Sequence, residues 1–187
     1  FIEFAQAESS LFNCEKKPLN LINLVQAVVK NNENALVAKN LDVEYNFDEF
    51  NQAIIYSDEN AIKIILQNIL ETSIKLTDAG SISVKIDHPD MEVIENCGAK
   101  IVKNANAFSY VRITITDTGI GLAESELDGI FEPYTQLDKV HKKNIVRSIS
   151  LGTAYTMLKR MGGAVWINSE VMKGSAFNII LPIEKLD

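Results

Sequence analysis

Residues 117–121 read Asp-Thr-Gly-Ile-Gly and directly follow a predicted strand in which Val111, Ile113 and Ile115 alternate with polar residues. A carboxylate at the end of a strand can accept hydrogen bonds from an exocyclic amine such as that of adenine. Glycine permits backbone angles and close approaches that a Cβ atom would forbid. The segment is therefore a candidate purine-recognition site. An ordinary turn after a strand has the same residue types, so only the neighbouring segments can decide between the two readings.

A second group of polar residues lies on a helix that we expect to begin at a cap residue, Ser57 or Asp58, and to end near residue 77. Asn68, Thr72 and Lys75 follow one another at i, i+4 and i+7, so we expect them to share a face opposite the apolar stripe. A polar stripe of this kind is usually solvated surface. The apolar stripe itself comprises Ile62, Ile65, Leu66, Ile69, Leu70 and Ile74.

The remaining elements predict an α+β fold. A helix capped by Asn20 carries an apolar stripe as far as Leu36, and a further short helix is expected over residues 124–131 and a third long one over 151–161. Residues 88–109 show no clear period, and we interpret them as a long excursion between two strands. Strands are expected over residues 41–47 with a hairpin partner at 53–56, over 81–87 and 110–116, and over 164–169 with a partner at 176–183.

This order of elements predicts a two-layer sandwich, a mixed and mostly antiparallel sheet of about five strands with about three helices on one face. The chain has 187 residues, which suits one domain. Its net charge of −7 argues against nucleic-acid binding, and no apolar run approaches the roughly 20 residues of a membrane span. The cysteines, Cys14 and Cys97, have no metal-ligand spacing.

Taken in order, these segments resemble the catalytic and ATP-binding domain of sensor histidine kinases, part of a wider family shared with gyrase, Hsp90 and MutL. Residues 68–77 (Asn-Ile-Leu-Glu-Thr-Ser-Ile-Lys-Leu-Thr) are similar to the N box, residues 117–121 match the first glycine box, and residues 131–134 match the F box. Residues 161–170 and 174–182 are similar to the closing strands. The resemblance implies the Bergerat ATP-binding fold over roughly residues 19–183.

The resemblance also implies roles for individual residues. Asp117 would receive the adenine amine, Gly119 and Gly121 would let the backbone approach the nucleotide, and Ser175 would lie near the carboxylate. Asn68 and Lys75 would face the phosphates, and Leu151, at the end of the second glycine box, is a further nucleotide-binding position. The implied cofactors are ATP and Mg²⁺, with Asn68 left as a weak metal ligand.

Two departures from the family pattern affect the triphosphate end. Thr72 stands where the family has the asparagine that binds Mg²⁺, and a hydroxyl is a poorer ligand for this cation. In the second glycine box, residues 146–151 read Val-Arg-Ser-Ile-Ser-Leu, so Ser148 and Ser150 replace glycines that would wrap the phosphates. Nearby Lys139, Lys142, Lys143 and Arg147 could supply charge, but exposed lysines are screened by salt and contribute little each.

Two hypotheses follow. In the first, the chain is the ATP-binding domain of a sensor histidine kinase that donates the γ-phosphoryl of ATP to a histidine, with weakened or lost Mg-ATP binding. In the second, it is a degenerate pseudokinase that acts as a regulatory or scaffolding module without phosphoryl transfer. The altered Thr72, Ser148 and Ser150 favour the second for the chemistry. A chaperone or mismatch-repair ATPase is disfavoured, because Glu71 precedes Thr72 on a neighbouring helix face.

The resemblance implies a domain organisation and partners. We expect residues 1–17 to be the end of a dimerisation helix and a linker, and residues 18–187 to be the ATP-binding domain. Because the chain begins at Phe1, we expect it to be a fragment, with the phosphoacceptor histidine upstream, since neither His88 nor His141 lies in a suitable motif. The implied partners are those upstream helices and a response-regulator receiver domain, in a homodimeric, membrane-anchored sensor with this domain in the cytoplasm. The oligomeric state of the fragment stays open.

Overall fold

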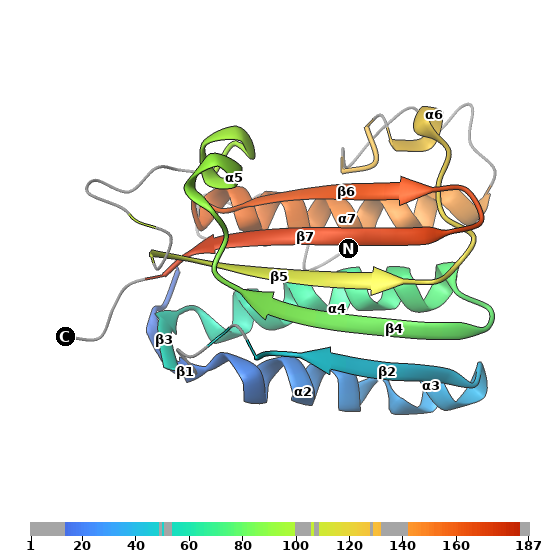
Figure 1. Ribbon diagram of the computed structural model, residues 1–187, viewed down its shortest axis with the longest axis horizontal. Helices are drawn as coiled ribbons and strands as arrows, with labels where there is room; N and C mark the ends of the chain where they lie inside the picture. Colours follow the sequence, from blue (N-terminus) through green and yellow to red (C-terminus); the bar gives the residue numbers. More distant parts are fainter. Residues whose placement is uncertain are drawn as a thin grey trace.

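A five-stranded sheet forms the centre of the computed structural model (Figure 1), which describes residues 14–48, 50, 54–99, 106, 109–127, 129–131 and 142–183, with residues 142–149 described by their backbone alone. The strand order is β2 (Leu41–Asn46), β4 (Gly80–Asp87), β5 (Tyr110–Asp117), β7 (Gly174–Pro182), β6 (Ala164–Glu170). The β2–β4 pair is parallel, and the other three pairs are antiparallel. The predicted mixed, mostly antiparallel sheet is confirmed.

Three long helices cover one face of this sheet, as predicted. They are α2 (Leu21–Asn31), α4 (Glu59–Leu76) and α7 (Lys142–Arg160), which run behind the strands in Figure 1. The main core lies between the two layers, where residues such as Ile65 of α4 and Ile113 of β5 are fully buried. The alternation predicted for β5 therefore turns one side of the strand towards the helices.

The starts of α2 and α4 follow from their cap residues. Asn20 Oδ1 accepts a hydrogen bond from Asn23 N at 2.9 Å, and Asp58 Oδ1 accepts one from Ala61 N at 2.9 Å. The predicted cap at Asn20 is confirmed, and of the two candidates for α4, Ser57 and Asp58, the cap is Asp58. The apolar stripe expected to continue to Leu36 is divided, because the chain turns at Asn32 and restarts as α3 (Glu33–Ala38).

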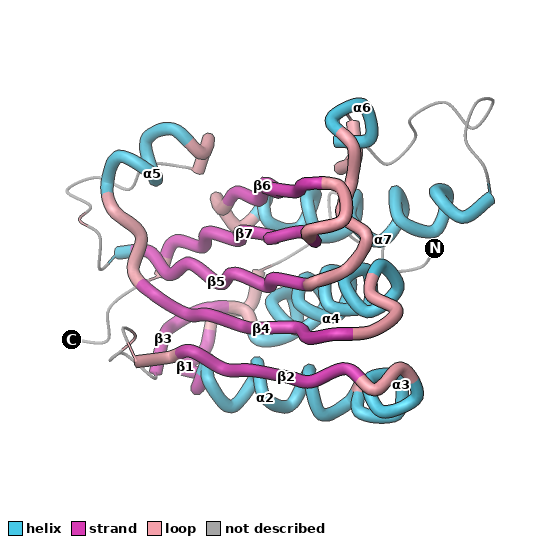
Figure 2. Tube along the Cα trace, turned by 45° about the vertical axis from the view of Figure 1, so that its right-hand side comes forward, coloured by secondary structure: helices cyan, strands magenta, loops and turns pink. Residues whose placement is uncertain are grey.

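The predicted pairing of residues 53–56 with the strand over residues 41–47 is wrong. The short strand β3 (Ile54–Ser57) pairs instead with β1 (Lys17–Asn20), in an antiparallel two-stranded sheet that is separate from the main one. The reason is that β1 leads directly into α2 and β3 into α4, and these two helices pack against each other. Figure 2 shows the two strands side by side at the end of the molecule where these helices begin.

Residues 88–109 contain a helix that the sequence pattern does not predict, α5 (Met91–Asn96). Ile94 is fully buried in a second, smaller apolar cluster with Tyr110 and Ile180. These strand residues alternate with Val111 and Ile179 of the main core, so α5 covers the opposite face of the sheet. A helix of six residues is too short to show a period, which is why it escapes prediction.

Two further helices differ in length from the prediction. The helix α6 (Glu124–Leu127) is shorter than the expected 124–131, and α7 begins at Lys142 instead of Leu151. No glycine or proline lies between residues 142 and 151 to stop a helix from extending in that direction.

Among the described residues, no helix is both long and apolar enough to cross a lipid bilayer.

Candidate functional site

Asp117 lies at the end of β5 with only 1% of its surface exposed. Its Oδ1 accepts hydrogen bonds from Gly119 N at 3.0 Å and from Ser175 N at 3.2 Å. Its Oδ2 is buried and has no hydrogen-bond partner among the described residues. One carboxylate oxygen, Oδ1, is thus held by backbone N–H groups, and the other, Oδ2, is an unused hydrogen-bond acceptor.

The buried position of Asp117 changes its acidity. Burial raises the pKa of the carboxyl above its ordinary value of 3.8, because the charged form loses hydration. The two backbone N–H groups and the nearby Ser73 hydroxyl stabilise the charged form and offset only part of this effect. An unpaired, desolvated acceptor of this kind favours a ligand that donates a hydrogen bond.

The loop after Asp117 is fixed by backbone hydrogen bonds to two other segments. Ile120 N donates to the carbonyl of Leu76, the last residue of α4, at 3.1 Å. Met172 N, in the turn between β6 and β7, donates to the carbonyl of Ile120 at 2.7 Å. The carboxylate is therefore positioned jointly by the end of α4 and the β6–β7 turn.

Close backbone packing explains the glycines of this loop. A Cβ atom on Gly119 would overlap the carbonyl of Leu76, and one on Gly121, at φ 63°, would overlap the carbonyl of Glu170. The glycines thus allow the backbone of this loop to lie close to the backbone at the ends of α4 and β6. Their expected approach to a nucleotide remains a prediction.

The polar residues predicted on α4 do not share one exposed face. Asn68 and Thr72 are 8% and 2% exposed, because α7 packs along α4, so this part of the polar stripe is buried and is not solvated surface. That the three residues lie opposite the apolar stripe stays a prediction. Lys75 is half exposed and lies 3.6 Å from Glu71 in an ion pair. Thr72 Oγ1 donates to the carbonyl of Asn68 at 2.8 Å, and Asn68 Nδ2 is buried with no partner in the described part of the chain.

Residues 57–185 match the family model of the Histidine kinase-, DNA gyrase B-, and HSP90-like ATPases, which is more than half of the chain. The chain belongs to this family. It is 29% identical over 187 residues to the autoinducer 2 sensor kinase/phosphatase LuxQ of Vibrio cholerae, and the match covers 100% of this chain and 20% of LuxQ. The resemblance to the ATP-binding domain of sensor histidine kinases is confirmed.

Solved structures show the same fold at low sequence identity. Full-length ShkA in complex with AMPPNP has a TM-score of 0.76 and 21% identity, and the match covers 99% of this chain and 35% of ShkA. Histidine kinase ThkA in complex with the response regulator protein TrrA has a TM-score of 0.67 and 18% identity, and the match covers 91% of this chain and 42% of ThkA.

The segment that we predict to be the second glycine box lies within a helix. Its six positions, residues 146–151, belong to α7. Leu151 is fully buried in the main core and Ser150 is partly buried. The side chain of Ser148 lies outside the described residues, as do residues 132–141, which include most of the F box and Lys139. Phe131, the first residue of the F box, stacks on Tyr155 of α7 with ring centroids 6.1 Å apart.

Ser73 is a residue of the N box that the sequence pattern does not single out. It is fully buried on α4, and its Oγ has no hydrogen-bond partner among the described residues. The hydroxyl nevertheless lies near enough to Asp117 to lower the pKa of that carboxyl. The only signal of this role in the sequence is that a serine stands beside Ile74 of the apolar stripe.

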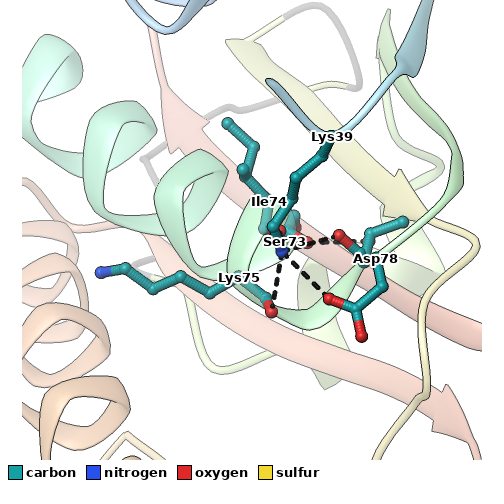
Figure 3. Close-up of polar contacts among 6 residues, drawn as sticks. Lys39, Ser73, Ile74, Lys75 and Asp78 are labelled. Atoms are coloured by element: carbon teal, nitrogen blue, oxygen red, sulfur yellow. Dashed lines mark hydrogen bonds and ion pairs between the residues drawn. The ribbon is translucent and has the colours of Figure 1, made fainter. Parts of the chain in front are cut away.

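The C-terminal end of α4 is held by Lys39, which lies between α3 and β2. Figure 3 shows its ammonium group among the last backbone carbonyls of the helix and the carboxylate of Asp78, while Lys75 points away from them. Because Leu76 of this helix end contacts the Asp117 loop, Lys39 supports the site from outside it.

The residues present fit a purine base better than they fit Mg²⁺. The buried Oδ2 of Asp117 can accept from an amine, whereas the Thr72 hydroxyl is already used within the helix. No group of three or more His, Cys, Asp or Glu side chains gathers into a metal site in the described part of the chain. Ser175 lies beside Asp117, as expected, and its Oγ is 2.9 Å from Ser169 Oγ.

A cavity of about 330 Å³ adjoins the Asp117 site, because Asp117, Gly174 and Ser175 are among the residues that line it. Its lining includes Thr116, Asn168 and Ala176, which alternate with the core residues Ile115 and Phe177. It therefore opens on the face of the sheet turned away from the three long helices.

Proposed function

We propose that this chain is the ATP-binding catalytic domain of a sensor histidine kinase in which adenine binding is retained and Mg-ATP binding is weakened. The observation that carries the first half is the buried Asp117 carboxylate, with Oδ1 held by two backbone N–H groups and Oδ2 unpartnered. The adenine amine would donate to Oδ2, which compensates the desolvated acceptor.

The weakening of Mg-ATP binding follows from two features of the helices. The Thr72 hydroxyl donates to the Asn68 carbonyl, so it is engaged where a metal ligand is needed. A helical backbone over residues 146–151 uses its N–H groups within the helix and does not turn them towards phosphates. Loss of the metal contact alone should weaken the binding free energy of Mg-ATP by about 1.5–3 kcal/mol, which is about 10- to 150-fold in affinity.

In the intact protein, the proposed reaction is transfer of the γ-phosphoryl of ATP to a histidine on a separate domain, and then to a response regulator. Residues 1–17 would be the end of the dimerisation helix and a linker, and residues 18–187 the catalytic domain of a homodimer. The similarity to ThkA, solved with a response regulator protein, supports this partner class. The chain spans about a fifth of the length of LuxQ, so further domains belong to the proposal.

The alternative is a pseudokinase that keeps the fold and its docking surfaces without phosphoryl transfer. The hydrogen bond that engages Thr72 and the helical second glycine box favour it. Calorimetric titration of the 187-residue chain separates the two functions. ADP without metal tests the base end, and ATP with Mg²⁺ tests the whole site.

We expect ADP to bind the wild type and not the Asp117→Asn variant, and ATP with Mg²⁺ to bind little better than ADP. Thr72→Asn combined with Ser148→Gly and Ser150→Gly should then raise the affinity for Mg-ATP. The matched control is Thr72→Asn with Ser148→Ala and Ser150→Ala, which removes the same hydroxyls without adding backbone freedom. Equal affinity of the wild type and the glycine variant would refute the proposed defect.

A further inference from the structure

One row of residues across three strands forms the floor and two walls of the cavity on the outer face of the sheet. Ala176 of β7 is the direct cross-strand neighbour of both Thr116 on β5 and Asn168 on β6. Its methyl group is shorter than the side chains on either side, so the row is hollowed at its centre, within the cavity of about 330 Å³. Small-molecule sites have volumes of about 300–1,000 Å³, so the hollow has the size for a small ligand.

The amide of Asn168 is held so that its N–H groups are available to a ligand. Its Oδ1 accepts hydrogen bonds from Trp166 Nε1 at 3.2 Å and from Asn178 Nδ2 at 3.0 Å. An indole N–H can only donate, so the atom that faces it is the amide oxygen. Asn178 is 8% exposed and is itself fixed by Thr114, whose Oγ1 donates to its Oδ1 at 3.1 Å. In the described part of the chain, the two N–H groups of Asn168 Nδ2 have no partner.

The opposite wall of the cavity adds a hydroxyl group, and its rim adds no net charge. Thr116 Oγ1 makes no hydrogen bond with any other described residue, so it is available as a donor and as an acceptor. At the rim, Lys173 and Glu170 form an ion pair, so the exposed charges of the lining cancel. The cavity therefore offers two amide donors and one hydroxyl on either side of a methyl group.

We propose that this cavity binds a neutral, hydroxyl-rich small molecule, a monosaccharide or an open-chain polyol. The ligand's hydroxyl groups accept from Asn168 Nδ2 and exchange hydrogen bonds with Thr116 Oγ1, while its C–H groups lie on the methyl group of Ala176. The site lies beyond the proposed function, because it is on the opposite face of the sheet from the long helices and does not depend on nucleotide binding.

The chemistry of the lining selects a neutral ligand. A cation cannot accept from the N–H groups of Asn168. An anion finds no net positive charge at the rim, and the net charge of −7 on the chain repels it. A hydroxyl group can both donate and accept, so it suits amide donors and a hydroxyl at the same time.

The fluorescence of Trp166 provides a direct readout, because it is the only tryptophan in the sequence and its indole N–H is bonded to Asn168. The 187-residue chain is titrated separately with D-glucose, D-ribose and glycerol, which represent six-membered, five-membered and open-chain polyols. Saturation-transfer NMR of the same samples detects the bound probe itself. We expect a saturable fluorescence change and saturation transfer with at least one probe. Absence of both signals for all three probes would overturn the inference.

Substitutions in the row test whether the probe lies in the cavity. Ala176→Val adds two methyl groups to the floor, and valine is well suited to a strand, so this variant should lose binding and remain folded. Thr116→Val keeps the shape of the side chain without its hydroxyl and should bind the probe about 3- to 10-fold more weakly. The control is Ser83→Ala, which removes a hydroxyl from the β4 neighbour of Thr116, outside the cavity lining, and should bind as the wild type.

Wild-type affinity in both Ala176→Val and Thr116→Val would place the probe elsewhere and overturn the inference. Melting temperatures show whether each variant is folded, and Thr116→Val carries the test if Ala176→Val is not. Acetate and ethylammonium are titrated in the same way, and saturable binding of either one in preference to the neutral probes would contradict the proposed ligand class. A chain that binds ADP but none of the neutral probes would overturn this inference and leave the proposed function intact.

Discussion

The ammonium nitrogen of Lys39 donates a hydrogen bond of 2.8 Å to the backbone carbonyl of Ile74, and it also reaches the carbonyl of Thr77 at 2.9 Å. The last carbonyls of a helix lack partners within the helix, and a cation near them is favoured by the helix dipole. Lys39 thus acts as a side-chain cap for α4 from a position 35 residues away in sequence. It stabilises the helix end that contacts the Asp117 loop.

Lys39→Met should lower the free energy of unfolding by about 1.5–3 kcal/mol, the range for hydrogen bonds to charged groups. Urea unfolding at pH 7 measures the change. The control is Lys63→Met, which replaces an exposed lysine on the same helix α4. The control should stay within about 0.5 kcal/mol of the wild type. Equal effects of the two substitutions would mean that the Lys39 contacts contribute nothing.

Gly174→Ala should destabilise the protein more than Gly98→Ala. Both glycines have a positive φ, 99° and 77°, so each substitution carries a dihedral cost of about 1–2 kcal/mol. At Gly174 the added Cβ would also overlap the carbonyl of Asp117, whereas at Gly98 the nearest atom is Lys159 Nζ at 3.6 Å. The overlap should add about 1–3 kcal/mol.

Thermal and urea unfolding of the two glycine variants measure this difference. ADP titration adds a second readout, because displacement of Asp117 should weaken binding in Gly174→Ala and leave Gly98→Ala unaffected. Similar stability losses would argue that the β6–β7 turn can shift to admit a Cβ atom.

Local patterns in the sequence suffice for the elements that carry the purine end of the site. The caps at Asn20 and Asp58, the alternation that leads to Asp117 and the closing hairpin each depend on residues close together in the chain. The hydrogen bonds of a helix cap and the two-residue period of a strand are interactions and patterns among residues close in the sequence. The elements, and with them the fold class, can therefore be predicted from the sequence.

Contacts between distant segments explain what the sequence does not predict. Thr72 is buried because α7 packs beside α4, and β3 pairs with β1 because the helices that follow them, α4 and α2, pack against each other. Lys39 and Ser73 have roles that depend on tertiary neighbours, Ile74 and Asp117. No pattern of spacing along the chain encodes such neighbours.

Asp117→Asn should stabilise the ligand-free protein at neutral pH. The folded-state pKa of Asp117 lies above 3.8, so the folded protein holds its proton to higher pH than the unfolded chain does. The contribution of this group to stability is complete below pH 3.8 and is lost as the pH rises through the folded-state pKa. A neutral asparagine avoids this loss and keeps an oxygen for the N–H groups of Gly119 and Ser175.

Urea unfolding of the wild type and Asp117→Asn between pH 3.5 and pH 8 checks this sign. The difference in unfolding free energy, variant minus wild type, should increase with pH and then level off. The same variant should lose ADP binding, so stability and affinity change in opposite directions. A difference that decreases with pH would contradict the raised pKa.

Asp87→Asn should have the opposite dependence on pH. Asp87 accepts two hydrogen bonds from Arg112, at 2.8 and 2.7 Å, and lies 3.1 Å from Lys85 Nζ. Burial alone would raise the pKa of Asp87, but the hydrogen bonds and charges of Arg112 and Lys85 outweigh it and hold that pKa below 3.8. The stabilisation is therefore present above pH 3.8 and is lost as the pH falls through the folded-state pKa.

At pH 7, Asp87→Asn should lower the free energy of unfolding by about 1.5–3 kcal/mol, because the nearly buried carboxylate has two cationic partners that asparagine cannot match. Asp42→Asn, at an exposed position on β2, is the control and should change stability little at pH 7. Urea unfolding at pH 7 and pH 2.5 should show the cost of Asp87→Asn shrinking at the lower pH. An equal cost at both values would show that shape and hydrogen bonding at this position matter more than the charge, which would remove the basis for a lowered pKa.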